Sequence, residues 1–150
     1  MTNPEIAKAN LKSKRVVVAG CSSYGRSLAI TLAKAGNQIT IIDKNKSKLD
    51  ELSQLTDKRN RIIGFVGDAT IMTDLIKLDI SDVQLFVCTT NSDSTNALAG
   101  QKAQQMFGVE DIVCLMSDNS RQKLYESLGI KVINHSQITS ESLASICLET

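Results

Sequence analysis

A glycine-containing loop near the start of the chain is the first group of residues whose types and spacing suggest chemistry. The segment from Gly20 to Gly25, GCSSYG, leads into a predicted helix whose free amides and dipole attract phosphate. The nucleotide-binding fingerprint of such loops is GxGxxG, and Ser22 replaces its second glycine, where the backbone approaches a pyrophosphate closely. A serine there either crowds the phosphates or offers them a hydroxyl. The alternative interpretation is a tight turn that binds nothing.

An aspartate, Asp43, ends the second apolar run, 18 residues after Gly25. From this position a carboxylate can accept hydrogen bonds from both hydroxyls of an adenosine ribose. The same carboxylate repels a 2′-phosphate, which argues for NAD(H), ADP or ATP as the ligand over NADP, although the adjacent Lys44 weakens that exclusion slightly. The alternative interpretation of Asp43 is a solvated turn residue or a cap for the next helix.

Two further polar segments follow the third and fourth apolar runs. Asp68, in Gly67-Asp68-Ala69, can cap the next helix or meet the adenine edge, and the residues alone favour capping. The segment 89–93, TTNSD, offers hydroxyl and amide groups to a cleft, or a cap for the helix after it. The predicted binding residues are Gly20, Ser22, Ser23, Tyr24, Gly25, Asp43, Lys44, Gly67, Asp68, Ala69, Thr89, Thr90 and Asn91.

Short β-branched runs alternate with amphipathic segments along the chain, which predicts the elements that position these residues. The expected strands are 15–19, 38–43, 61–66, 84–89, 111–115 and 130–133. The expected helices are one from Tyr24 to the Gly36 stop, then 46–55, 70–78, 92–107, 119–128 and one from about Gln137. The alternation predicts a Rossmann-type α/β fold, a doubly wound parallel six-stranded sheet of order 3-2-1-4-5-6 between helical layers. Ligands of such sheets bind at the carboxyl ends of the strands.

Length and composition limit the classes of function. The 150 residues suit one domain, which we expect over 14–150 after an amino-terminal tail, 1–13. The 17 basic and 16 acidic residues leave a net charge of +1, which argues against a nucleic-acid partner. The absence of a long apolar run and of an apolar signal-peptide core argues against membrane insertion and for a cytoplasmic protein. The four scattered cysteines are interpreted as reduced thiols, without a metal site.

Together the motifs resemble one family, the amino-terminal domain of the RCK (or KTN) proteins found in TrkA and KtrA type subunits of bacterial potassium transporters. The resemblance spans about residues 14–149 and is carried by the segments 16–20, 43–45, 67–70, 89–96 and 124–130 and by Gly25. It implies a cytoplasmic regulatory (gating) subunit of a potassium uptake system that senses NAD(H) or ADP/ATP. It also implies a place at the inner face of the cell membrane beneath a potassium-translocating subunit, pairing through a carboxy-terminal crossover helix, and assembly into a dimer or octameric ring.

The resemblance also implies roles for individual residues. In the family the loop glycines contact phosphate, the acid matching Asp43 holds the ribose, and the acid matching Asp68 lies by the adenine. Residues matching Thr90 and Asn91 face the ligand.

Two features of the chain depart from the family pattern. Ser22 is one, and the other is the segment 115–118, LMSD, where similar proteins often carry a basic residue that meets the phosphates. A charge-assisted hydrogen bond contributes about 1.5–3 kcal/mol, so we expect weaker phosphate binding unless Arg26 or Arg121 compensates.

Two alternative functions follow from the same residues. One is a NAD-dependent oxidoreductase, but the only histidine, His135, is interpreted as a solvated loop residue, and neither tyrosine has a lysine four residues later. The other is a ligand-free assembly domain. We expect no catalytic residues, and the final helix either pairs with a second subunit or covers its own sheet.

Overall fold

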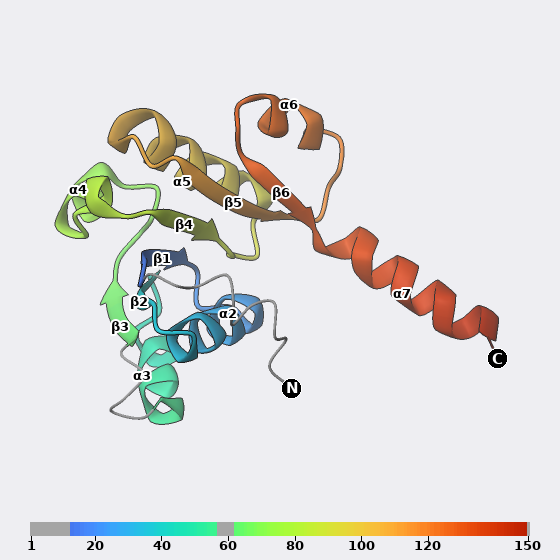
Figure 1. Ribbon diagram of the computed structural model, residues 1–150, viewed down its shortest axis with the longest axis horizontal. Coiled ribbons are helices and arrows are strands. Elements are labelled where there is room, and N and C mark those ends of the chain that lie inside the picture. The colour runs from blue at the N-terminus through green and yellow to red at the C-terminus, as the bar shows by residue number, and fades with distance from the viewer. Residues whose placement is uncertain (1–12, 57–61, 150) are drawn as a thin grey trace.

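The computed structural model describes residues 13–56 and 62–149, so the predicted tail, apart from Ser13, and Arg61 lie outside the described residues. Six parallel strands form one sheet in the predicted order, β3-β2-β1-β4-β5-β6 (Figure 1). The strands are β1 Arg15–Ala19, β2 Gln38–Asp43, β3 Ile62–Val66, β4 Leu85–Cys88, β5 Asp111–Met116 and β6 Lys131–Asn134. The α-helices are α2 Ser23–Lys34, α3 Lys46–Leu55, α4 Met72–Lys77, α5 Asp93–Phe107, α6 Gln122–Ser127 and α7 His135–Glu149, with a short 3₁₀ turn at Ile80–Asp82.

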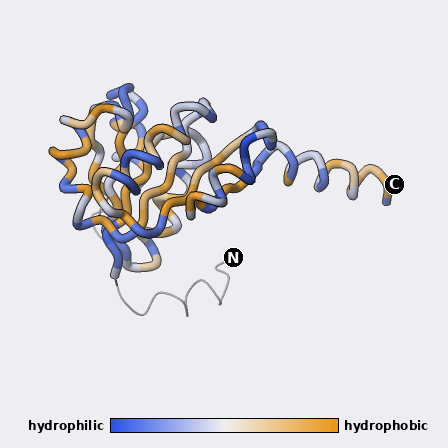
Figure 2. The backbone as a smooth tube through the Cα atoms, turned by 90° about the horizontal axis from the view of Figure 1, so that it is seen from above, coloured by the Kyte–Doolittle hydropathy of each residue, from blue (hydrophilic) through white to orange (hydrophobic). Residues whose placement is uncertain are grey.

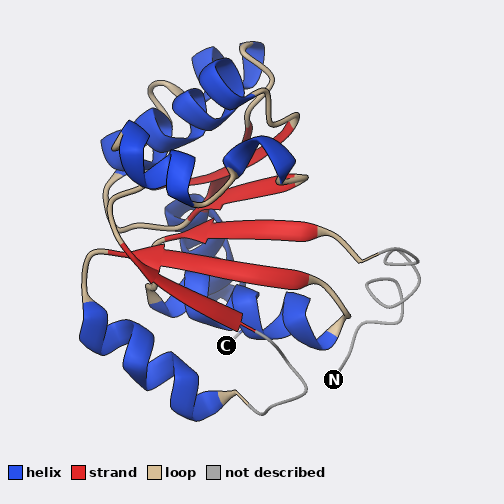
Figure 3. Ribbon diagram, turned by 90° about the vertical axis from the view of Figure 1, so that its left-hand side faces the viewer, coloured by secondary structure: helices blue, strands red, loops and turns tan. Residues whose placement is uncertain are grey.

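Helices cover both faces of the sheet because successive residues of each buried strand point to opposite sides. Val16 and Val18 of β1 pack in one core with α2 and α3, whereas Val17 and Ala19 pack in the other with α4 and α5. Figure 3 shows the sheet between these helical layers. The three-layer Rossmann-type fold predicted from the sequence is therefore confirmed.

The order in which successive strands are added across the sheet reverses at β1, which pairs with β2 on one side and with β4 on the other. The loops after β1 and β4 consequently leave the sheet toward opposite layers, and a crevice opens between them at the carboxyl ends of the strands. The strand order thus fixes the edge of the sheet at which a ligand can bind.

Three helices start two or more residues away from the predicted position, and at each of these starts a side chain bonds a nearby amide. Asp68 Oδ1 accepts from the Thr70 amide (2.8 Å), and Asp118 Oδ1 accepts from the Ser120 amide (2.9 Å). These turns delay the starts of α4 and α6 past the predicted 70 and 119. Helix α7 begins before the predicted 137, because it follows β6 directly and Asn134 Oδ1 accepts from the Gln137 amide (2.9 Å).

Helix α7 extends away from the body of the domain (Figures 1 and 2). None of its described residues is buried, and Ile138 and Leu143 are 53% and 59% exposed. The alternative that this helix covers its own sheet is therefore wrong. In the described part of the chain, no helix is both long enough and apolar enough to cross a membrane.

Candidate functional site

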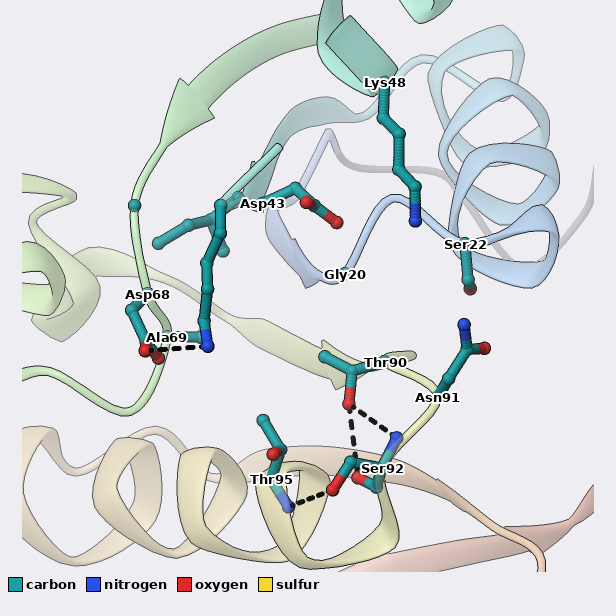
Figure 4. Close-up of a pocket in the computed structure, with 13 residues that line it drawn as sticks. Gly20, Ser22, Asp43, Lys48, Asp68, Ala69, Thr90, Asn91, Ser92 and Thr95 are labelled. Atoms are coloured by element: carbon teal, nitrogen blue, oxygen red, sulfur yellow. Dashed lines mark hydrogen bonds and ion pairs between the residues drawn. The ribbon is translucent and has the colours of Figure 1, made fainter. Parts of the chain in front are cut away.

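A cleft of about 350 Å³ lies at the carboxyl edge of the sheet, between the loops that follow β1 to β4 (Figure 4). Most of the predicted binding residues line it: Gly20, Ser22, Asp43, Lys44, Gly67, Asp68, Ala69, Thr90 and Asn91. Four further residues line it: Ser92, which belongs to the polar segment 89–93, and Ile42, Lys48 and Thr95, which the sequence analysis missed. Four predicted residues are not part of the lining: Ser23, Tyr24, Gly25 and Thr89.

Close contacts with neighbouring backbone and side-chain atoms fix the shape of the glycine loop. A Cβ on Gly25 would lie 2.0 Å from the Gly20 carbonyl oxygen and 2.4 Å from Thr89 Oγ1. Gly20 itself has φ +112°, and a Cβ there would lie 2.7 Å from the Thr90 amide. The buried Thr89 hydroxyl donates to the Gly20 carbonyl (2.8 Å), so Gly25 and Thr89 set the loop's path from behind.

Ser22 uses its hydroxyl within the protein. Its Oγ donates to the Thr89 carbonyl (2.6 Å) and accepts from the Gly25 amide (3.2 Å), so it is the N-cap of α2. The hydroxyl proton is therefore engaged, and Ser22 does not offer it to a phosphate in this structure. The amides of Ser23 and Tyr24 open the helix, where no earlier helical carbonyl can accept from them, and they remain as donors to an anion.

Asp43 is half-buried at the end of β2 and joins the glycine loop to the loop before α3. Its Oδ2 accepts from the Cys21 amide (2.8 Å) and its Oδ1 from the Asn45 amide (2.7 Å). Asn45, which accepts from the Ser47 amide (3.0 Å), is the cap of α3, so the interpretation of Asp43 as that cap is wrong. An ionised carboxylate has about four acceptor positions, so both oxygens can still accept from ribose hydroxyls.

Cys21 lies beneath this junction. Burial, and then the negative charge of Asp43, raise the pKa of its thiol, against the opposing charges of Arg26 and Lys48. Its Sγ lies 3.7 Å from the Lys48 carbonyl, which it contacts as a donor. The thiol therefore stays protonated at neutral pH and ties the glycine loop to α3.

Asp68 forms a turn and an ion pair instead of capping α4. Its Oδ1 accepts from the Thr70 amide (2.8 Å) and hydroxyl (2.6 Å), and its Oδ2 lies 3.3 Å from Lys44 Nζ. The residue before α4 is Ile71, which makes no side-chain cap bond, so the preferred prediction of capping is wrong. Burial opposes ionisation of Asp68, but these hydrogen bonds and Lys44 hold the pKa of its carboxyl below the usual value.

The far wall of the cleft is held by a buried amide that the sequence analysis did not assign to the site. Asn96 is 1% exposed, and its Nδ2 donates to the carbonyls of Thr90 (3.0 Å) and Leu115 (2.9 Å). Its Oδ1 accepts from the Thr90 amide (2.9 Å). Ser92 caps α5, the role considered as the alternative for the segment 89–93, while Asn91 reaches into the cleft (Figure 4).

The two arginines considered as substitutes for the missing base after β5 lie elsewhere. Arg26 pairs with Glu51 (3.8 Å), and Arg121 lines a separate cavity of about 220 Å³. After β5, the amides of Ser117 and Asp118 donate to the Asp93 carboxylate. Neither arginine lines the cleft, so the predicted compensation by them is not supported.

Tyr24 turns away from the cleft toward the start of α7. Its ring lies 5.3 Å from that of His135, centroid to centroid, with the planes inclined at 51°. His135 is half-buried and is the first residue of α7, so its interpretation as a solvated loop residue is wrong. The first turn of α2 therefore contacts the first residue of the projecting helix α7.

The fold and the cleft define a Rossmann-type α/β domain whose candidate site lies at the switch point of its sheet. Residues 16–136 match the TrkA-N domain family, to which this chain belongs. The family resemblance found in the sequence motifs is thus confirmed.

Two similar curated proteins carry the name Trk system potassium uptake protein TrkA. The relative from Streptomyces coelicolor is 28% identical over 129 residues, which are 85% of this chain and 56% of that protein. The relative from Halomonas elongata is 27% identical over 140 residues, 93% of this chain and 30% of that protein. The chain thus spans about half of the first relative and less than a third of the second.

Solved structures share the fold at low sequence identity. The TrkA-N domain of the inner membrane protein YbaL from Escherichia coli has a TM-score of 0.76 at 11% identity, over 91% of this chain and 98% of that one. The NAD(P)-binding domain of an exopolyphosphatase-related protein from Archaeoglobus fulgidus has a TM-score of 0.72 at 19% identity, over 91% and 99%. The NAD-bound GsuK channel has a TM-score of 0.65 at 13% identity, over 83% and 22%.

Proposed function

We propose that residues 14–150 form a nucleotide-sensing regulatory domain, which binds NAD(H) or ADP/ATP and gates a potassium uptake system. The observation that carries this proposal is the position of Asp43 beside the glycine loop, in the cleft of a TrkA-N domain. The names of the TrkA relatives support the transport role, and the NAD in the GsuK structure supports the ligand class.

The cleft suggests one orientation for the nucleotide. The ribose hydroxyls would donate to Asp43, which places the adenine toward Gly67 and Ala69 and the phosphates toward the start of α2. Thr90 and Asn91 would face the ligand from the opposite wall. The carboxylate of Asp43 disfavours a 2′-phosphate, so we propose NADP as the weaker ligand.

The proposed mechanism uses α7 as the pairing helix of a homodimer or larger ring. Its exposed apolar residues are suited to a second copy, because an isolated projecting helix gains little stability from its own domain. The ring contact between Tyr24 and His135 joins the phosphate-facing helix to α7. Two nucleotides that bind two arrangements of the pair with different affinity would shift their populations, and equal affinities would shift nothing.

We propose a membrane potassium-translocating subunit as the partner, with this domain on the cytoplasmic side and no nucleic-acid ligand. We favour binding over catalysis, because the residues that line the cleft in the described chain include no histidine, tyrosine or cysteine. Thermal unfolding with nucleotides tests the ligand-free alternative, and an assay of NADH turnover tests the oxidoreductase alternative.

A thermal-unfolding panel with NAD, NADH, NADPH, ADP and ATP tests the ligand class. A ligand at 100 times its dissociation constant stabilises by about 2.7 kcal/mol, which raises the Tm of a domain of this size by roughly 5–10 °C. We expect that shift with at least one of the four ligands other than NADPH. No shift with any of them would favour the ligand-free assembly domain, and turnover of NADH with a small carbonyl substrate would favour the enzyme.

Light scattering of a Leu143→Glu variant tests the role of α7. We expect the parent to be a dimer or larger and the variant to dissociate at least ~30-fold more readily, because the new carboxylate would be buried unpaired. The control is Leu55→Glu, which changes an equally exposed leucine on α3. A monomeric parent, or equal dissociation of both variants, would contradict pairing through α7.

A further inference from the structure

The positively charged side chains that line the cleft differ in whether they form an ion pair with a carboxylate. Among the described residues that line it, only Lys44 and Lys48 carry a positive charge. Lys44 lies 3.3 Å from Asp68, whose lowered pKa keeps that partner ionised. Within the described chain Lys48 makes no ion pair of 4.0 Å or less. Lys48 is therefore the cation that a ligand meets without first displacing a carboxylate.

The backbone of Lys48 is fixed against the glycine loop. It is the third residue of α3, a helix whose start is held by the Asn45 cap. Its carbonyl contacts Cys21 Sγ (3.7 Å), and the Cys21 amide in turn donates to Asp43 (2.8 Å). The backbone of Lys48 is thus connected through Cys21 to the glycine loop and to Asp43, which are proposed to hold the phosphates and the ribose.

The Lys48 side chain points from α3 into the cleft, and its ammonium group lies between Asp43 and Ser22 (Figure 4). A phosphate chain that runs from a ribose at Asp43 to the start of α2 passes through this space. The Ser22 hydroxyl is engaged with Thr89, so the donors that remain near the start of α2 are backbone amides, the Asn91 side-chain amide and the Lys48 ammonium (Figure 4). Of these, only the Lys48 ammonium carries a full positive charge.

We infer that Lys48 binds the phosphates of the nucleotide and makes affinity rise with the charge of the phosphate chain. The inference rests on the proposed nucleotide site and assigns to Lys48 the role for which neither Arg26 nor Arg121 is placed. The lysine ammonium is a compact charge with three hydrogen-bond donors. The affinity that it adds therefore depends more on the charge of the phosphates than on their geometry.

Isothermal titration of adenosine, AMP and ADP into the whole chain and into Lys48→Gln tests the inference. We expect the parent to bind in the order ADP, AMP, adenosine. The variant should lose ~10- to 100-fold in affinity for ADP and less than about twofold for adenosine, because only the charge-assisted contact is removed. Lys48→Arg should retain most of the ADP affinity. Thermal unfolding without ligand should be unchanged, because Lys48 is exposed.

The matched control is Lys46→Gln, which removes the same charge from the same helix at a residue that does not line the cleft. Equal losses of ADP affinity in the two variants would indicate a diffuse field and overturn the inference. So would an unchanged ADP affinity in Lys48→Gln, or equal losses for adenosine and ADP, while the parent still binds. A parent that binds none of the three ligands would instead refute the proposed nucleotide site, and the inference with it.

Discussion

Asp43→Asn is expected to weaken ADP or NADH binding by ~10- to 150-fold. The ribose hydroxyls donate to a charged carboxylate in the proposed complex, and such a bond contributes about 1.5–3 kcal/mol. The amide also places an NH₂ group where the Cys21 and Asn45 amides now donate, so one of these contacts is lost as well. Isothermal titration of parent and variant measures the difference.

The ligand provides a second arm for this experiment. Removing the ribose hydroxyl, with 2′-deoxy-ADP and 3′-deoxy-ADP, should weaken binding to the parent but have little further effect on Asp43→Asn, as a double-mutant cycle requires. Asp50→Asn, on the exposed side of α3, is the control for the lost charge. If the two losses were simply additive, or if Asp43→Asn bound as tightly as the parent, the ribose assignment would be wrong.

Gly25→Ala is expected to lower the free energy of unfolding by about 3 kcal/mol, equivalent to a fall in Tm of roughly 6–12 °C. The new Cβ would lie 2.0 Å from the Gly20 carbonyl oxygen, which is backbone and cannot turn aside as a flexible side chain would. The first turn of α2 must therefore move away from β1. Because that movement displaces the amides proposed to bind phosphate, nucleotide affinity should fall as well.

Gly108→Ala separates this clash from the loss of glycine's conformational freedom. Gly108 ends α5 with φ +70°, and no atom lies within 4 Å of its added Cβ. It should lose only about 1–2 kcal/mol through left-handed strain and keep its affinity for ADP. Equal stabilities of the two variants, with normal binding by both, would contradict the role given to Gly25.

The sequence alone predicted the order of the elements, the strand order and the edge at which the cleft lies. These features follow from local periodicity: β-branched runs such as 15–19 and 38–43 are buried on both faces, and each is followed by an amphipathic helix. Right-handed crossovers then leave few ways to arrange six parallel strands. The clustering of Gly20, Asp43, Asp68 and Thr90 follows from the same topology, because all lie at or just after strand ends.

Only the tertiary structure decided what the side chains of these loops contact. Ser22 bonds Thr89, Asp68 bonds Thr70 and Lys44, and Lys48 of α3 lines the cleft. Likewise, α7 projects from the domain although its sequence also fits a helix that covers the sheet. The hydrophobic periodicity of the sequence indicates whether a residue is buried, but it does not indicate which residue distant in the chain it contacts. That choice depends on how the crossover helices bring residues far apart in the chain within hydrogen-bond distance.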